Sequence, residues 1–161
     1  LQTFKEMSSL LFFFLIGKIL AQYKGCDHYQ TLKPNKMYFI ASPRFSRNYL
    51  RGSNCRWAME APPGYKISLR CHDVWLPSTI SCYGDRILVS RTGRKDLRDA
   101  HRHCGGISFA ETSTSTRITV GLKTGAFTKG GKFKCSLKTV ASTCRCGQLN
   151  RAKIGESLLM R

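Results

Sequence analysis

Two segments near the middle of the chain alternate apolar and polar residues with a period of two, and this pattern restricts the fold more than any other feature. The segments are 56–60, in which Trp57 and Met59 share one side, and 65–71. Successive side chains of a strand point to opposite faces, so each segment predicts a strand with one buried face. The Ala61-Pro62-Pro63-Gly64 sequence between them has two prolines and a glycine, and therefore predicts a turn.

The same alternation recurs later in the chain. Residues 117–123 alternate, and so do residues 132–138, whose apolar set is Phe133, Cys135 and Leu137. A shorter strand is predicted at 37–40. Glycine, proline, serine and threonine turns separate these segments, and no helical period follows residue 21. The pattern predicts an all-β fold, an antiparallel β-sandwich.

The N-terminal segment carries the signature of an export signal. An apolar run from Leu10 reaches Leu20 with one interruption, at Lys18. The run is too short to cross about 30 Å of hydrocarbon as a helix. Lys5 before the run and the small residue Ala21 after it favour a secretory signal peptide over residues 1–21, with the residues before Met7 as an upstream extension. A buried core helix and a membrane anchor are the alternatives.

Cysteine content and charge describe the rest of the chain. Eight cysteines favour disulfides formed in an oxidising compartment, and therefore a secreted, extracellular protein with no transmembrane span after cleavage. The length left after the signal suits one domain. Lysine and arginine number 27 against 9 aspartates and glutamates, a formal charge of +18.

The order of several motifs resembles a known family. Residues that match it are Cys26, Ser42-Pro43-Arg44-Phe45 with Tyr49, Cys55-Arg56-Trp57, Pro63-Gly64-Tyr65-Lys66-Ile67-Ser68-Leu69, Cys82-Tyr83-Gly84-Asp85 with Ile87-Leu88-Val89, and Cys104-Gly105. In order, spacing and type these residues resemble a CUB domain, here assigned to residues 22–142. The resemblance implies a CUB-type antiparallel β-sandwich with jelly-roll topology, stabilised by disulfides.

The C-terminal part is similar to one branch of that family, the insect CUB-serine proteases, including those of venoms. Cys144-Arg145-Cys146-Gly147 is followed by a basic linker and by Lys153-Ile154, which resembles an activation cleavage bond. The similarity ends after Ile154. Residues 143–161 are therefore interpreted as a cysteine-rich basic linker and a truncated protease activation region.

We expect no catalysis from this chain and assign no catalytic residue. A chymotrypsin-like protease needs a serine, a histidine and an aspartate held by a scaffold of its own. None of His28, His72, His101 and His103 lies in a protease-like motif, and the sequence Gly-Asp-Ser-Gly does not occur.

The resemblance also implies a disulfide pattern, Cys26 with Cys55 and Cys82 with Cys104. Cys71 and Cys135 both lie in the inward set of their strands, so an interior pair between them is sensible and fits the insect branch. The remaining two, Cys144 and Cys146, stay unassigned: they are unpaired, joined to each other, or paired between chains. A metal site formed by Cys144, Cys146, His101 and His103 is disfavoured in a secreted protein.

Many CUB domains bind calcium, and Asp85 matches one acidic ligand of that site. The later acidic ligand is missing, because Lys123-Thr124-Gly125-Ala126 stands there. Calcium requires several oxygen ligands and negative charge. We therefore expect no metal and no cofactor, with Asp85 as a weak metal candidate whose alternative role is a hydrogen bond to a turn or an ion pair with an arginine.

The basic excess supplies the remaining functional signal. Cations in the outward sets of the predicted strands are Lys66, Arg70, Arg117, Lys123, Lys132, Lys134 and Lys138. Gathered on one face, they would attract sulfated glycans, anionic lipid headgroups or acidic proteins. The alternative is a solvated surface without a ligand. Nucleic acid is disfavoured, because no nucleic-acid motif occurs.

The sequence thus predicts a secreted, non-catalytic CUB binding module that recognises an extracellular protein or a polyanion. The alternative is the N-terminal fragment of a trypsin-like CUB-serine protease zymogen, and a third reading is a cationic membrane-active protein. A monomer is expected, and a disulfide-linked dimer stays open.

Overall fold

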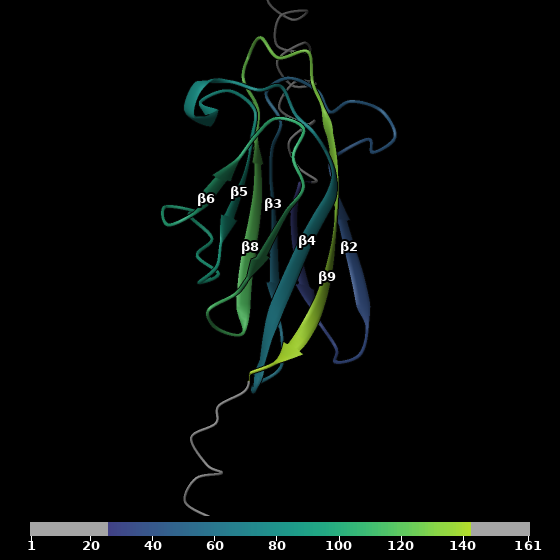
Figure 1. Cartoon of the computed structure of the whole chain (residues 1–161), viewed down its shortest axis with the longest axis vertical. Helices are drawn as coiled ribbons and strands as arrows, with labels where there is room; N and C mark the ends of the chain where they lie inside the picture. The colour runs from purple at the N-terminus through teal and green to yellow at the C-terminus, as the bar shows by residue number, and fades with distance from the viewer. Residues whose placement is uncertain (1–25, 143–161) are drawn as a thin grey trace, which may run out of the picture.

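A computed structural model describes residues 26–142, which form a sandwich of two β-sheets (Figure 1). The elements in chain order are β1 (Asp27–Thr31), β2 (Met37–Ala41), β3 (Asn54–Glu60), β4 (Tyr65–Trp75), the 3-10 turn η1 (Ile80–Cys82), β5 (Arg86–Ser90), β6 (His101–His103), β7 (Phe109–Thr112), β8 (Arg117–Lys123) and β9 (Lys132–Ala141). The expected signal peptide, Cys144, Cys146 and the Lys153-Ile154 bond lie outside the described residues. Within residues 26–142 no helix is long and apolar enough to span a membrane.

One layer is a five-stranded sheet, here called sheet A, with the order β1-β3-β8-β5-β6. Four of its five strands pair antiparallel, but β1 pairs with β3 in parallel. The prediction of an antiparallel sandwich therefore needs one correction. Strand β1 enters beside β3, where the Cys26–Cys55 disulfide fixes its start.

The other layer is a four-stranded sheet, here called sheet B, with the order β2-β9-β4-β7. Its two central strands, β4 and β9, are the longest in the protein and lie side by side along the sandwich (Figure 1). Their pairing shifts register between Cys71 and Asp73, so His72 is an extra residue in β4. Such a bulge bends and twists the strand that carries it.

The core lies between the sheets and is formed by the apolar positions that alternate in the sequence. Trp57 and Met59 of β3 are buried, and so are the inward residues of β4 and β9. The Trp57 ring meets Phe133 edge to face with 5.6 Å between the ring centroids. The sequence pattern is confirmed here because a period of two reports directly which side of a strand is buried.

Three disulfides stabilise the sandwich. They join Cys26 with Cys55 and Cys82 with Cys104, the pairs that the resemblance implied, and Cys71 with Cys135, the interior pair inferred from the inward sets of the two strands. The Cys71–Cys135 bond is fully buried and joins register partners of β4 and β9. It therefore lies directly beneath the outer surface of sheet B.

Candidate functional site

Five cations gather on the outer surface of sheet B, here called the cationic face. Two come from β4 and three from β9, because these strands are paired and the same parity of each points outward. They are Lys66, Arg70, Lys132, Lys134 and Lys138. The sequence predicted these five residues for a polyanion site, and the structure brings them onto one face.

The register keeps the cations from standing directly opposite one another. Lys138 is paired with Ser68, and Arg70 is paired with Ser136. Cation and serine thus alternate in these two pairs, so that Arg70 and Lys138 are diagonal neighbours about 7–8 Å apart at their Cα atoms. Like charges directly opposite would destabilise the sheet, and the alternation avoids this while it keeps the charge density high.

Exposed apolar side chains border the cations. In sheet B, Met37 and Phe39 on β2 are 56% and 60% exposed, and Trp75 at the end of β4 is 70% exposed. The Lys134 ammonium stands over two rings, 5.0 Å from the centroid of Phe39 and 5.8 Å from that of Phe45. These contacts hold a long cationic side chain over the face, which therefore offers apolar area as well as charge.

The five cations are not neutralised by their surroundings. Among residues 26–142, none of them forms an ion pair within 4.0 Å. The acid beside them is Asp73, the register partner of Lys134. The other four cations have no acidic register partner in sheet B, so they keep a field that attracts anions.

Two further predicted residues lie elsewhere, which corrects the expectation of a single face. Arg117 and Lys123 occupy opposite ends of β8, and β8 pairs with β3 and β5 in sheet A. Arg117 is also engaged, since its Nε lies 3.4 Å from Glu60 Oε1. The period of two showed that both side chains point outward, but it could not show from which sheet.

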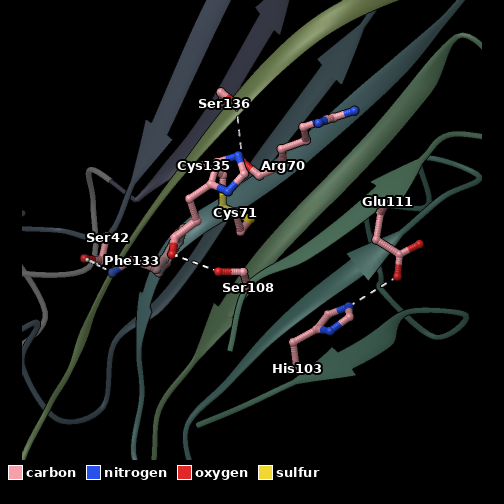
Figure 2. Close-up of a disulfide and its surroundings, with 10 residues drawn as sticks. Ser42, Arg70, Cys71, His103, Ser108, Glu111, Phe133, Cys135 and Ser136 are labelled. Carbon is pink, nitrogen blue, oxygen red and sulfur yellow. Dashed lines mark hydrogen bonds and ion pairs between the residues drawn. A yellow bond between two sulfur atoms is a disulfide. The ribbon is translucent and has the colours of Figure 1, made fainter. Parts of the chain in front are cut away.

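Figure 2 shows one residue of the cationic face, Arg70, next to the disulfide that joins β4 and β9. The Cys71–Cys135 disulfide joins β4 and β9, and the Arg70 side chain extends away from it. Ser136 Oγ donates a hydrogen bond of 3.4 Å to the carbonyl oxygen of Arg70. The cations next to this bond are thus carried by strands that cannot separate while it is intact.

The weak metal candidate, Asp85, is buried at 2% exposure and satisfied by protein donors. Tyr49 donates its hydroxyl to Oδ2 at 2.7 Å, the Gly125 amide donates to Oδ1 at 2.8 Å, and the Thr128 hydroxyl donates to Oδ2. Burial raises the pKa of the Tyr49 hydroxyl, which stays protonated as a donor. The carboxylate therefore ties three loops together.

These residues do not fit a calcium ion. Calcium takes six to eight oxygen ligands, several of them carboxylates, whereas Asp85 is the carboxylate of this cluster and its oxygens already accept from donors. Within the described part of the chain, no group of three histidine, cysteine, aspartate or glutamate residues is arranged to hold a metal ion. Of the two alternatives for Asp85, the hydrogen bond to a turn is the one observed.

A polar contact that the sequence did not reveal joins the free edges of the two sheets. Glu111 Oε1 of β7 in sheet B lies 3.2 Å from His103 Nε2 (Figure 2) and 2.9 Å from His101 Nδ1, and both histidines are on β6 in sheet A. The His103 ring also stacks on Phe109, with 3.7 Å between centroids. Burial lowers the pKa of His103. The spacing His-x-His placed both rings on one side of a strand, but their partner comes from another strand.

The histidines show no catalytic arrangement within residues 26–142. Two of them contact Glu111, and His28 stacks on Trp57 with 6.0 Å between ring centroids. The hydroxyl near His72 is that of Ser108, and it donates to the backbone carbonyl rather than to the ring.

Comparisons with known proteins agree with this architecture. A family model described as the CUB domain matches residues 26–136. Venom serine protease 34 of Apis mellifera is 29% identical over 134 residues, which cover 80% of this chain and 30% of the relative. The chain thus spans less than a third of the length of this curated relative.

Solved structures share the fold. The extracellular region of zebrafish Gpr126/Adgrg6 matches with a TM-score of 0.62 at 24% identity, over 72% of this chain and 15% of that one. The MASP-1 CUB2 domain bound to Ca²⁺ matches with a TM-score of 0.56 at 16% identity, over 68% of this chain and 96% of that one.

Proposed function

Because the chain belongs to the CUB domain family, a class of protein-interaction modules found in secreted and membrane proteins, we propose that it is an extracellular binding module whose cationic face binds polyanions. No protease domain is present in this chain. The ligand class that we infer is a sulfated or otherwise anionic polymer, such as a glycan chain.

One observation carries the proposal: the five cations lie on adjacent strands without an acidic partner within 4.0 Å among the described residues. A polymer with repeated anionic groups can contact several of them at once, and each added contact makes the next one intramolecular. A single small anion gains no such advantage. The arrangement therefore favours a polyanion over an isolated carboxylate or phosphate.

The apolar side chains at the border support contacts beyond charge. Phe39 and Trp75 are exposed on either side of the β9 cations. Aromatic side chains give large contact area at low entropic cost. A ligand that lies along β9 would therefore be held by direct contacts as well as by the field, and its binding would depend on ligand structure.

Chromatography tests this distinction. We expect the protein to elute from immobilised heparin at a clearly higher salt concentration than from a cation exchanger of equal charge density. Exposed charges are screened by salt over about 8–10 Å, so both salt concentrations measure electrostatic attraction. The difference between the two concentrations measures how well the arrangement of the cations fits the heparin chain. Elution from both at the same salt concentration would contradict the proposal.

Matched variants locate the surface. Replacing three face cations (Lys66→Gln, Arg70→Gln, Lys138→Gln) should remove most of the difference between heparin and the exchanger. The control variant (Arg98→Gln, Arg102→Gln, Lys123→Gln) loses the same charge from the sheet A side. It should lower both elutions equally and keep the difference. If both variants behave alike, net charge alone explains retention.

The proposal of an extracellular location rests on the three disulfides, which persist in oxidising compartments, and on the predicted signal peptide at residues 1–21. Expression in secretory cells should deliver the oxidised protein to the medium, with a new N-terminus near Ala21. Retention in the cell with free thiols would contradict it.

A second candidate function is that of the N-terminal part of a serine protease zymogen. The similarity to the venom protease over most of this chain favours it, as does the Lys153-Ile154 sequence. Sequencing the transcript beyond Arg161 decides between the two: a continuing reading frame with protease motifs supports the zymogen, and a stop codon supports the separate module.

A further inference from the structure

Sheet A carries a pocket on its outer surface, on the side of the sandwich opposite the cationic face. Its cavity volume is about 540 Å³, within the range of ordinary small-molecule sites. We call it the Tyr29 pocket. The residues that matter here are Tyr29, Ala58, Glu60, Lys95, Arg117 and Thr119.

The sheet register explains the floor of the pocket. Ala58 of β3 is paired with Tyr29 of β1 on one side and with Thr119 of β8 on the other. Two small side chains thus lie next to an aromatic one, which leaves a hollow beside the Tyr29 ring. Tyr29 is exposed, so that ring is open to a ligand.

The loop between β5 and β6 forms the opposite wall. It is held over the sheet at two glycines, where side chains would collide. A Cβ on Gly93 would lie 2.3 Å from Arg117 Cβ, and one on Gly121 would lie 2.4 Å from Leu97 Cδ1. This close approach fixes the place of Lys95, whose ammonium stands 6.0 Å from the centroid of the Tyr29 ring.

The polar groups of the pocket include both an acceptor and donors. Glu60 accepts a hydrogen bond from the Tyr29 hydroxyl, and its Oε1 lies 3.4 Å from Arg117 Nε. The hydrogen bond to Glu60 raises the pKa of Tyr29. Within residues 26–142 the Lys95 ammonium forms no ion pair. One carboxylate and two cations therefore line the same space.

The floor also holds an unused polar group. Thr119 is 1% exposed, and its hydroxyl has no hydrogen-bond partner among the described residues. A buried hydroxyl without a partner is unfavourable. This hydroxyl oxygen lies beneath the floor, where a ligand in the pocket cannot reach it.

We propose that the Tyr29 pocket binds a single sugar unit that carries a carboxylate or a sulfate group. The anionic group pairs with Lys95 and with the outer nitrogens of Arg117, the sugar ring stacks on Tyr29, and ring hydroxyls donate to Glu60. A simple anion would be repelled by Glu60, and an acidic amino-acid side chain brings no hydroxyl donors for it. Only a ligand with both an anion and hydroxyls matches all of these groups.

This site is separate from the cationic face, and one experiment tests it alone. The folded, disulfide-bonded protein is titrated with glucuronic acid and with N-acetylglucosamine 6-sulfate, and backbone amide shifts are followed by NMR. We expect saturable shifts at Tyr29, Lys95 and Thr119 with at least one of the two charged sugars, and weaker shifts with glucose or inorganic sulfate. Equal binding of inorganic sulfate, or no shift with either charged sugar, would overturn the proposal.

Variants then separate the site from its structural surroundings. Lys95→Gln should weaken binding of the charged sugar about tenfold, the usual loss for one charge-assisted hydrogen bond. Tyr29→Leu should weaken binding several-fold, because it removes the exposed ring on which the sugar stacks. Arg102→Gln on β6, outside both the pocket and the cationic face, is the control and should leave sugar affinity unchanged.

The outcomes for the two sites are independent. Sugar affinity that is unaffected by Lys95→Gln and by Tyr29→Leu would overturn the pocket and leave the cationic face untouched. Loss of heparin retention on removal of the face cations, with sugar binding intact, would support both sites as distinct.

Discussion

The cations on the two outer surfaces of the sandwich have different neighbouring residues. On the sheet A side, arginines stand beside acids: Arg56 Nη2 lies 2.6 Å from Asp27 Oδ2, and Arg94 Nη2 lies 2.5 Å from Asp96 Oδ2. On sheet B, Arg70 and Lys138 stand beside serines, and of the five face cations only Lys134 has an acid, Asp73, as its register partner. Net charge is therefore a poor guide to binding, and the position of the few acids decides which cations remain available.

The acids on the sheet A side are placed in two ways: Asp27 meets Arg56 through the fold, and Asp96 meets Arg94 two residues before it in the chain. Asp96 holds its position through Arg94, and this hydrogen bond lowers the pKa of Asp96 to about 2. It thus stays ionised across the ordinary working range of pH, and it continues to neutralise sheet A. No acid performs this role for Lys66, Arg70 or Lys138 among the described residues. A polyanion therefore meets a group of adjacent unpaired cations on sheet B.

The comparison requires that both faces belong to one rigid sandwich, and removing the buried disulfide tests this most severely. Cys71→Ala with Cys135→Ala opens a loop with a sequence separation of 64. We expect the free energy of unfolding to fall by about 4 kcal/mol in the unfolded-state entropy model. Urea denaturation without reductant measures it.

The matched control opens the shorter loop of Cys82 and Cys104, with a separation of 22. Its loss should be smaller, about 3 kcal/mol. In both cases the heparin preference should persist in whatever fraction remains folded. A larger loss from the Cys82–Cys104 bond would show that the interior bond is not the main covalent support of sheet B.

The next largest effect on stability is expected from replacing the buried acid Asp85. This change also tests whether the position of a charged residue matters more for heparin binding than the net charge of the protein. Asp85→Ala leaves the donors of Tyr49 and Gly125 without an acceptor. Unfolding free energy should fall by about 3 kcal/mol, since unsatisfied buried donors cost roughly 1–3 kcal/mol each. Thermal or urea unfolding measures the loss, and Tyr49→Phe, which removes a single donor, should cost about 1 kcal/mol.

Asp85→Ala also raises the net charge of the protein by one. Because Asp85 lies at the loops and not on sheet B, the difference between heparin and exchanger elution should not change. An increase equal to that caused by adding a cation to sheet B would mean that net charge governs retention after all.

A feature of the fold could be predicted from the sequence where it depends on neighbouring residues in the chain, and not where it depends on pairing with distant segments. The inward and outward sides of β3, β4, β8 and β9 followed from the period of two, because burial on one side leaves that pattern in the sequence. Strand β1 left no such trace, since all of its residues are exposed. The disulfide pairs came from the family resemblance, and only the Cys71–Cys135 pair had support from strand parity.

The functional residues divide in the same way. The five cations of the cationic face lie on two strands that pair with each other, so outward parity was sufficient to group them. Arg117 and Lys123 were grouped with them wrongly, because the sheet to which β8 belongs is set by long-range pairing. The Tyr29 pocket draws on four distant segments, and the Glu111 contact joins two sheets. Neither leaves a signal along the chain.

A single acid placed on sheet B should make it resemble sheet A. Ser136 is the register partner of both Arg70 and Phe39, so Ser136→Glu puts a carboxylate among the cations. We expect the heparin preference to fall markedly, whereas stability should change by less than about 1 kcal/mol, as for exposed ion pairs. Heparin elution and urea denaturation measure the two effects.

Asn54→Asp is the control for this change. It adds the same charge to sheet A opposite Lys123, and it should lower elution from heparin and from the exchanger by equal amounts. Equal behaviour of the two variants would remove the distinction between the faces.

The smallest expected effect concerns the one place where the free edges of the sheets meet. His103 of β6 contacts Glu111 of β7, with His101 and Arg91 as the other charged or titratable neighbours of Glu111. Burial, the largest cause, lowers the pKa of His103 below its ordinary value of 6.5. The unfolded chain therefore binds a proton more readily than the native one, and this contribution to stability is complete above about pH 6.5. It is lost as the pH falls from there through the lowered native pKa.

Urea denaturation at pH 7.5 and pH 5.0 should show a lower unfolding free energy at the acid end, and His103→Gln should remove part of that difference. His28→Gln, which leaves the edge contact intact, should keep it. An unchanged pH dependence in His103→Gln would show that the edge contact does not couple the two sheets to protonation, so that the faces respond to acid independently of it.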